Sequence, residues 1–156
     1  MKTLNLLIFK INQENFVIEI DNLVQIIRYI KPTPIPKTPS FIEGIIVLRN
    51  MVVPVINLKK RLFGEQEEKE KKPKIFIAKI NDLTLGFKVD NLYKIFAIEE
   101  DKILPPPPAI PGMAVDYIKG IVELEGLVYL FLDIKKTISK EEIDMLKNLE
   151  KDKKGK

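Results

Sequence analysis

The feature that most constrains this chain of 156 residues is an internal duplication. Lys10-Ile11-Asn12 recurs as Lys79-Ile80-Asn81, an offset of 69 residues (79 − 10), and Asp21-Asn22-Leu23 recurs at the same offset as Asp90-Asn91-Leu92. A unit that is written twice predicts two similar halves. Further along, seven more positions recur at an offset of 76 (120 − 44); they are Ile42, Gly44, Ile45, Leu48, Val52, Lys59 and Lys60, matched by Ile118, Gly120, Ile121, Leu124, Val128, Lys135 and Lys136.

Each copy alternates short apolar runs with polar turns, about every eight to twelve residues, which is typical of β-strands. Five short strands per copy predict a small closed barrel, because closure leaves no exposed sheet edge. We therefore predict an all-β fold of two pseudo-repeated five-stranded β-barrels. The expected strands are Thr3–Ile11, Phe16–Ile20, Leu23–Ile30, Ile45–Leu48 and Met51–Ile56 in the first copy, and Ile75–Ile80, Leu85–Val89, Tyr93–Ile98, Ile121–Leu124 and Val128–Leu132 in the second.

Several of these strands are apolar at nearly every position, for example Leu6–Phe9 and Val128–Leu132. Such strands are expected to be buried on both faces, so the two barrels should share one hydrophobic core. We predict a single domain over residues 1–138. The first barrel is expected at about residues 15–73, and the second at about 74–138 together with the N-terminal strand 3–12.

Helical signals are few. Asn57 is a candidate N-cap of a short turn that ends at Gly64, and Asp133 is expected to be the matching cap in the second copy. Ser139-Lys-Glu-Glu142 is a capping-box pattern, followed by Ile143, Leu146 and Leu149 at helical spacing. Residues 139–156 are therefore predicted to form a short amphipathic helix, docked on the second barrel, and a Lys-rich tail.

The composition excludes several classes of enzyme. The chain has no histidine and no cysteine, which removes imidazole-based acid-base catalysis, Ser-His and Cys-His nucleophiles and the usual zinc sites. We expect no catalytic residue, no metal and no cofactor. The carboxylates of Glu99-Glu100-Asp101, and of Asp90 with Asp116, are the remaining candidates for a carboxylate enzyme. The apolar run near the N-terminus is too short for a secretion signal, so a cytoplasmic protein is expected.

The net charge of +4 and the pI of about 9.1 admit a basic module that binds nucleic acid nonspecifically. Much of the charge, however, is concentrated in Gly64–Lys74 and in the C-terminal KDKKGK, which we expect to be a solvated loop and tail. The chain has no phosphate-binding loop, and only 8% of its residues are aromatic, too few for a base-stacking platform. Nucleic-acid binding is therefore kept as the alternative.

A proline-rich segment precedes the last two strands of each copy. The prolines at 36 and 39, and those at 108 and 111, have the PxxP spacing of polyproline ligands. Because both segments occupy the same place in the repeat, a rigid connection between strands explains them better.

The two copies differ most at one hairpin turn. Arg49-Asn50 joins two apolar strands in the first copy, and Glu125-Gly126 takes its place in the second. Asn tolerates the positive φ of a tight turn, so Arg49 is predicted to be exposed at the tip of a rigid hairpin. A charge that reverses between similar units is not needed for folding, which indicates a surface for partners; two unrelated solvent-exposed charges are the alternative.

The residues that follow resemble a known family. Gly44-Ile-Ile-Val-Leu-Arg-Asn-Met-Val-Val-Pro-Val-Ile-Asn-Leu58, with Arg61-Leu-Phe-Gly64 after it, closely resembles the CheW pattern G-V-I-N-L-R-G-x-V-V-P-V-I-D-L followed by R-F-G. Gly86-Phe-Lys-Val-Asp90 and Tyr117-Ile-Lys-Gly120 also match, and the likeness covers about residues 3–138.

This resemblance implies two SH3-like barrels around a common core, and a non-enzymatic adaptor that couples chemoreceptors to the histidine kinase CheA. The implied partners are the CheA regulatory domain, at the barrel ends, and the cytoplasmic tip of chemoreceptors, in the groove between barrels. No small-molecule substrate is implied, and the protein is expected at receptor arrays on the inner face of the membrane. Flagellar chemotaxis and another chemosensory pathway fit equally.

The resemblance also supplies a partner-binding set. We expect an exposed apolar patch around Leu23 and Ile26, with Arg49 at its edge. Two family positions differ here: the Asn before Leu-Arg is Val47, and the Gly after Arg is Asn50. A third, commonly Glu in the family, is Gln25, which reduces pairing with Arg49 to a neutral hydrogen bond. The predicted set is Leu23, Gln25, Ile26, Gly44, Leu48, Arg49 and Asn50.

Overall fold

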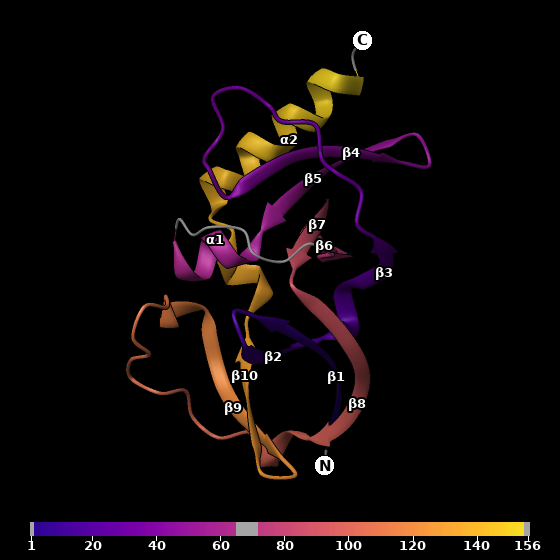
Figure 1. The fold of residues 1–156 in the computed structure, drawn as a ribbon. Helices are drawn as coiled ribbons and strands as arrows, with labels where there is room; N and C mark the ends of the chain where they lie inside the picture. Colours follow the sequence, from indigo (N-terminus) through magenta and orange to yellow (C-terminus); the bar gives the residue numbers. More distant parts are fainter. Residues whose placement is uncertain (1, 65–71, 155–156) are drawn as a thin grey trace.

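The computed structural model describes residues 2–64 and 72–154, with side chains placed as far as residue 149 (Figure 1). Most of the predicted charged loop and the end of the Lys-rich tail lie outside these ranges. The described chain forms two five-stranded sheets. In the first copy of the repeat the strands are β1 (Thr3–Ile11), β2 (Glu14–Glu19), β3 (Leu23–Arg28), β4 (Ile42–Leu48) and β5 (Met51–Asn57); in the second they are β6 (Lys74–Ile80), β7 (Leu83–Val89), β8 (Asn91–Glu99), β9 (Ile118–Leu124) and β10 (Leu127–Leu132).

The two copies exchange strands. One sheet has the order β8-β1-β2-β10-β9, and the other has the order β3-β6-β7-β5-β4. Each sheet therefore takes its first hairpin from one copy and its other three strands from the other copy. We call them the β1–β2 barrel and the β6–β7 barrel. The expected division of the chain is wrong for β2, β6 and β7, whereas placing the N-terminal strand with the second copy's strands is correct.

The length of one connection explains the exchange. In the β6–β7 barrel, β3 and β7 both run antiparallel to β6, which lies between them. Strands β3 and β7 are therefore parallel to each other. If β1 and β2 took the places of β6 and β7, β3 would have to run parallel to β2. The chain would then have to pass back along the whole length of β2 before β3 could begin. That strand of six residues is about 20 Å long, and the three residues 20–22 reach about 11 Å at most. The chain therefore crosses to the other barrel.

Three apolar clusters follow from this arrangement. Alternate residues of β1 enter different clusters: Leu4, Leu6 and Ile8 fill the β1–β2 barrel, while Leu7 and Phe9 face the other sheet. The β6–β7 barrel has its own interior cluster around Val53, Val55, Ile75 and Ile77. The largest cluster lies between the barrels, where the rings of Phe9, Phe16, Phe76 and Phe87 stack in pairs. The predicted shared core is thus present, and it explains strands that are buried on both faces.

The proline-rich connections close each barrel. Thr33 and Ile45 exchange two backbone hydrogen bonds of 2.8 and 2.9 Å, and Leu104 and Ile121 exchange two of 2.9 Å. A Cβ on Gly44 would lie 2.1 Å from the carbonyl oxygen of Thr33. Gly44 is thus required for this close approach. At its counterpart Gly120 in β9, a Cβ would lie 2.6 Å from the Ile103 side chain and 3.0 Å from the carbonyl oxygen of Leu104.

An ion pair fastens the two copies together at the edge of the core. Lys59 Nζ lies 2.9 Å from Asp90 Oδ1, and both side chains are largely buried. The backbone N–H of Asn12 donates to the other oxygen of Asp90 at 2.9 Å. Lys59 belongs to helix α1 (Leu58–Phe63) of the first copy and Asp90 to the second, so this pair joins the two exchanged copies.

The C-terminal helix α2 (Lys140–Lys154) starts with the predicted capping box, in which Ser139 and Glu142 satisfy each other's backbone N–H. The helix lies along β5 rather than on the β1–β2 barrel (Figure 1). Two contacts hold it there: Ile143 and Leu146 pack into the core between the barrels, and Arg61 of α1 donates to both carboxylate oxygens of Glu142 at 2.9 and 3.0 Å.

The second copy's helical turn differs from the first. Asn57 caps α1 by accepting from the backbone N–H of Lys60 at 3.1 Å, as predicted. Asp133 occupies the matching position before the short 3-10 turn η4 (Ile134–Thr137) but makes no capping hydrogen bond with its side chain. The expected Asp133 cap is therefore wrong. None of the helices in residues 2–64 and 72–154 has the length and apolar character needed to span a membrane.

Candidate protein-interaction surface

The β4–β5 hairpin carries Arg49 at its tip, and it projects from the body of the molecule (Figure 1). Arg49 and Asn50 both have positive φ, of 49° and 65°, as a two-residue turn of this kind requires. Glu125 and Gly126 repeat the turn with φ of 50° and 83°. All four residues are exposed. The same backbone geometry therefore carries opposite charges at two tips.

Strand β3 presents a different apolar surface from the one expected. Its residues alternate between half-buried and exposed, with Leu23 and Gln25 inward and Val24 and Ile26 outward. Leu23 packs against the core between the barrels, so it does not share a patch with Ile26. A β-bulge between Leu23 and Gln25, opposite β6, leaves Val24 without a partner in register. The exposed pair on this strand is Val24 and Ile26, 53% and 47% exposed.

Two other predicted residues serve the fold. Gly44 is buried beneath the first proline-rich connection. Leu48 is half-buried and packs on the interior cluster of the β6–β7 barrel, together with Ile27 and Tyr29. Neither residue is exposed, although both were predicted to contact a partner. Of that set, the structure exposes Ile26, Arg49 and Asn50.

Sequence reasoning missed most of the exposed apolar side chains. The outward phase of a strand that is apolar on both faces cannot be deduced from its composition, because the pattern does not alternate. The β-bulge in β3, and the one between β1 and β8, shift the phase further. The exposed large apolar residues other than Val24 and Ile26 are Ile30, Val47, Tyr93, Ile95, Leu104, Leu127 and Val128.

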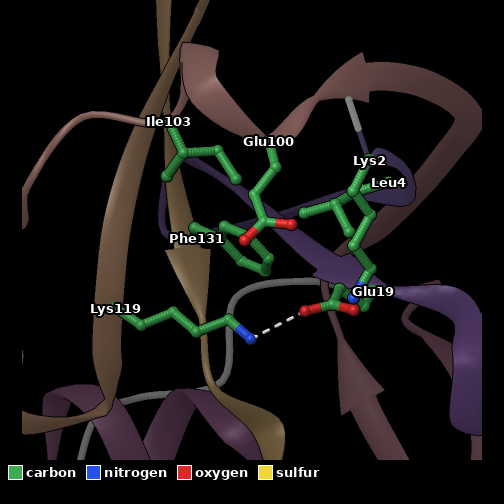
Figure 2. A pocket seen from close by; sticks show the side chains of 7 residues that line it. All are labelled: Lys2, Leu4, Glu19, Glu100, Ile103, Lys119 and Phe131. Atoms are coloured by element: carbon green, nitrogen blue, oxygen red, sulfur yellow. Dashed lines mark hydrogen bonds and ion pairs between the residues drawn. The ribbon is translucent and has the colours of Figure 1, made fainter.

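One end of the β1–β2 barrel holds a hollow of about 330 Å³, which opens beside an ion pair (Figure 2). Lys119 Nζ donates to Glu19 Oε1 at 2.9 Å and lies 4.4 Å from the centre of the Phe131 ring. Lys2 and Glu100 also line this hollow. It holds two lysines and two glutamates, so its charges balance within the site.

The twin position in the β6–β7 barrel carries the same pair with its charges reversed. Glu43 takes the place of Lys119 on β4, and Lys88 takes the place of Glu19 on β7; their charged atoms lie 3.5 Å apart. Lys88 Nζ also lies 5.5 Å from the centre of the Tyr29 ring. In each pair one residue comes from the first copy and the other from the second. Exchanging the acidic and the basic residue between the two positions therefore leaves an ion pair in place. These charges therefore serve the fold.

A third hollow, of about 300 Å³, lies where the turn η1 (Ile20–Asn22) leaves one barrel for the other. Asp21 and Asn22 line it from η1, and Asp133 and Lys135 line it from the other side. Its lining is mainly polar.

The carboxylates considered for catalysis differ in their surroundings. Asp90 is paired with Lys59, and Asp116, Glu99 and Asp101 are exposed. Within the described ranges, no three Asp or Glu side chains gather as metal ligands would. The geometry instead offers exposed apolar and charged groups on rigid strands and turns, which is the chemistry of protein recognition.

Comparison with known proteins agrees with the motif resemblance. The family model described as the CheW-like domain matches residues 5–142. "Chemotaxis protein CheW" of Treponema pallidum is 32% identical over 149 residues, covering 92% of this chain and 87% of that protein. Its namesake from Thermotoga maritima is 30% identical over 138 residues, covering 88% and 89%.

The fold gives the same answer. The crystal structure of the scaffolding protein TtCheW from Thermoanaerobacter tengcongensis superposes with a TM-score of 0.79 at 30% identity. The superposition covers 88% of this chain and 94% of that one. The comparisons lend no support to the nucleic-acid alternative. The predicted fold class of two SH3-like barrels is confirmed, and this chain belongs to the CheW-like family of chemotaxis proteins.

Proposed function

We propose that this chain is a non-enzymatic scaffold that couples the cytoplasmic tips of chemoreceptors to the regulatory domain of the kinase CheA. Membership of the CheW-like family supports it, as does the description of the structural relative as a scaffolding protein. On this proposal the chain works in the cytoplasm and is recruited to receptor arrays at the membrane. It needs no cofactor.

One observation indicates which part of the surface binds the partners. The two hairpin tips have the same turn geometry and opposite charges, Arg49 against Glu125. A backbone that tolerates both signs does not depend on either for stability, so the charge is free to serve a partner. Arg is also enriched at the centres of protein interfaces.

The contact surface then consists of the Arg49–Asn50 tip and the outward face of β3. Val24 and Ile26 supply exposed apolar area, and Arg49 supplies charge and several N–H donors. Gln25 points inward and is half-buried. Its part in the proposed surface is to support the strand that carries Val24 and Ile26.

The test compares Arg49→Glu with Glu125→Arg, its mirror-image change at the other tip. Binding of this chain to the purified CheA regulatory domain and to a receptor-tip fragment is measured by calorimetry. Arg49→Glu should weaken one or both affinities by about tenfold or more, which corresponds to about 1.4 kcal/mol. Glu125→Arg should leave both affinities within about twofold, because it reverses a charge of the same size outside the proposed surface.

A second variant tests the apolar part. Ile26→Asp places a charge on the exposed face of β3 and should weaken binding, while its cost in stability stays within the about 1 kcal/mol over which strand propensities range, so the variant still folds. This change is preferred to Leu23→Asp, which would place a half-buried carboxylate against the apolar core. If Arg49→Glu and Ile26→Asp both fold and bind both partners as the parent does, the site assignment is wrong.

A further inference from the structure

One end of the β1–β2 barrel opens into a hollow of about 540 Å³ that the proposed function does not use. It is lined by the end of β1 and by the starts of β2, β8 and β10, and its wall is mostly apolar. Its volume is within the range of sites that hold small molecules, about 300–1,000 Å³. The lining residues are Ile8, Lys10, Asn15, Tyr93, Lys94, Leu127 and Tyr129. We call this cavity the tyrosine hollow.

Aromatic and aliphatic side chains form the apolar wall of the tyrosine hollow. Tyr93 and Leu127 are 50% and 54% exposed, so both keep apolar surface in contact with solvent. Tyr129 is half-buried, and its ring centre lies 6.4 Å from that of Phe96, which packs on the interior cluster of the barrel. Aromatic rings prefer stacked or edge-to-face neighbours. The wall therefore suits a ligand that carries an aromatic ring.

The polar side chains at the tyrosine hollow can all donate hydrogen bonds, and no carboxylate is among the described residues that line it. Lys10 and Lys94 have no ion-pair partner within residues 2–64 and 72–154. The amide of Asn15 and the hydroxyl of Tyr129 likewise have no hydrogen-bond partner in this part of the chain. Two positive charges beside unused donors favour an anion with oxygen acceptors, and a carboxylate provides both.

The twin positions in the β6–β7 barrel show that the fold does not need these groups. Three residues of the hollow have different counterparts there: Val24 for Tyr93, Gln25 for Lys94 and Val53 for Tyr129. A bulge lies at the same point of both barrels, so the backbone is alike. Val53 is fully buried in the interior cluster of its barrel. Two aromatic rings and one ammonium group are thus particular to the tyrosine hollow, and barrel closure does not explain them.

We propose that the tyrosine hollow binds a small aromatic carboxylate. The ring of the ligand packs against Tyr93 and Tyr129, and its carboxylate accepts hydrogen bonds from the ammonium groups of Lys10 and Lys94. The mostly apolar wall selects against inorganic anions, which have no apolar body to bury. This site belongs to the β1–β2 barrel, whereas the proposed contact surface on β3 and the β4–β5 hairpin belongs to the β6–β7 barrel. The inference therefore does not rest on the proposed function.

The test is a titration of the isotope-labelled full chain with three probes, followed by the NMR shifts of its backbone amides. Phenylpropionate has the ring and the carboxylate, phenylpropanamide keeps the ring without the charge, and propionate keeps the charge without the ring. Phenylpropionate should shift the signals of residues that line the tyrosine hollow and should saturate them, with a dissociation constant on the order of 1 mM or below. The other two probes should each bind at least about tenfold more weakly, because each lacks one of the two contacts.

Two substitutions that take their residues from the twin barrel locate the site. Lys94→Gln removes one of the two charges and should weaken the binding of phenylpropionate by about threefold. Tyr129→Val removes a ring from the wall and should weaken it by about tenfold. Lys79→Gln is the matched control, because Lys79 is the exposed counterpart of Lys10 in the other barrel, and it should leave the affinity unchanged. Lys94 is itself exposed, so its variant is expected to fold as the parent does.

Three results would each overturn the proposal. The first is phenylpropionate that gives no saturable shift at the tyrosine hollow. The second is phenylpropanamide that binds as tightly as phenylpropionate, which would show that the charges of the hollow do not recognise the carboxylate. The third is a folded Lys94→Gln chain that binds phenylpropionate as the parent does. None of these results bears on the proposed function, because no kinase or receptor is present.

Discussion

At the scale of single residues, the two reversed ion pairs show how exchanged copies diverge. Glu19 and Lys119 come from different copies, as do Lys88 and Glu43. The two pairs differ in exposure. The Lys119 side chain is 37% exposed, whereas that of Lys88 is 8% exposed. Water screens the first pair more than the second.

This difference leads to a prediction about stability. Glu43→Gln should lower the free energy of unfolding by about 1–3 kcal/mol, because it removes a negative charge beside a buried ammonium group. Glu19→Gln, the same change in the more exposed pair, should cost less than about 1 kcal/mol. Urea unfolding of both variants measures the two costs. An equal loss of unfolding free energy in the two variants would contradict the conclusion that water screens the Glu19–Lys119 pair more than the Glu43–Lys88 pair.

At the scale of elements, α2 is held by one side chain of α1 together with its own apolar face. Arg61 bonds both oxygens of Glu142, and its guanidinium lies 4.4 Å from the centre of the Phe41 ring. Ile143 and Leu146 on the same helix are buried in the core between the barrels. Arg61, the first residue of the motif Arg61-Leu-Phe-Gly64, thus has a structural role in docking α2.

Arg61→Lys tests the contribution of the Arg61–Glu142 contact. Lysine keeps the charge but cannot form the planar two-pronged contact, so the free energy of unfolding should fall by about 1–3 kcal/mol. Hydrogen exchange should also speed up in α2. Arg28→Lys, on the exposed face of β3, is the matched control and should alter neither quantity. Unchanged exchange in α2 with Arg61→Lys would show that apolar packing alone holds the helix.

At this scale, some features could be predicted from the sequence and others could not. The turn at Arg49-Asn50, the Asn57 cap and the capping box before α2 were all predicted, because each depends on residues close in sequence. The outward phase of β3 was not predicted, because its apolar residues fill both faces and its bulge depends on the pairing with β6. The expected patch of Leu23 with Ile26 was wrong for that reason.

At the scale of the whole molecule, the exchange of hairpins makes each half dependent on the other. The first copy alone would have to place β1 and β2 beside β3, which its three-residue connection forbids. Each barrel is complete only when both copies are present.

Separated fragments test this dependence. Residues 1–64 and 65–156, made as two polypeptides, should each lack a cooperative unfolding transition. Their equimolar mixture should recover a far-UV circular dichroism spectrum like that of the intact chain, and one cooperative melt. A cooperative melt of residues 1–64 alone would contradict the explanation by connection length.

The sequence by itself determined the duplication, the number and approximate limits of the strands, the two tight turns, the shared core and the family. These follow from local patterns and from the repeat. Only the tertiary structure decided which hairpin belongs to which barrel, because that depends on the direction of strands relative to the length of a connection. It also decided which apolar side chains remain in solvent, Val24, Ile26, Tyr93 and Leu104 among them, since strand phase is fixed by pairing across a barrel.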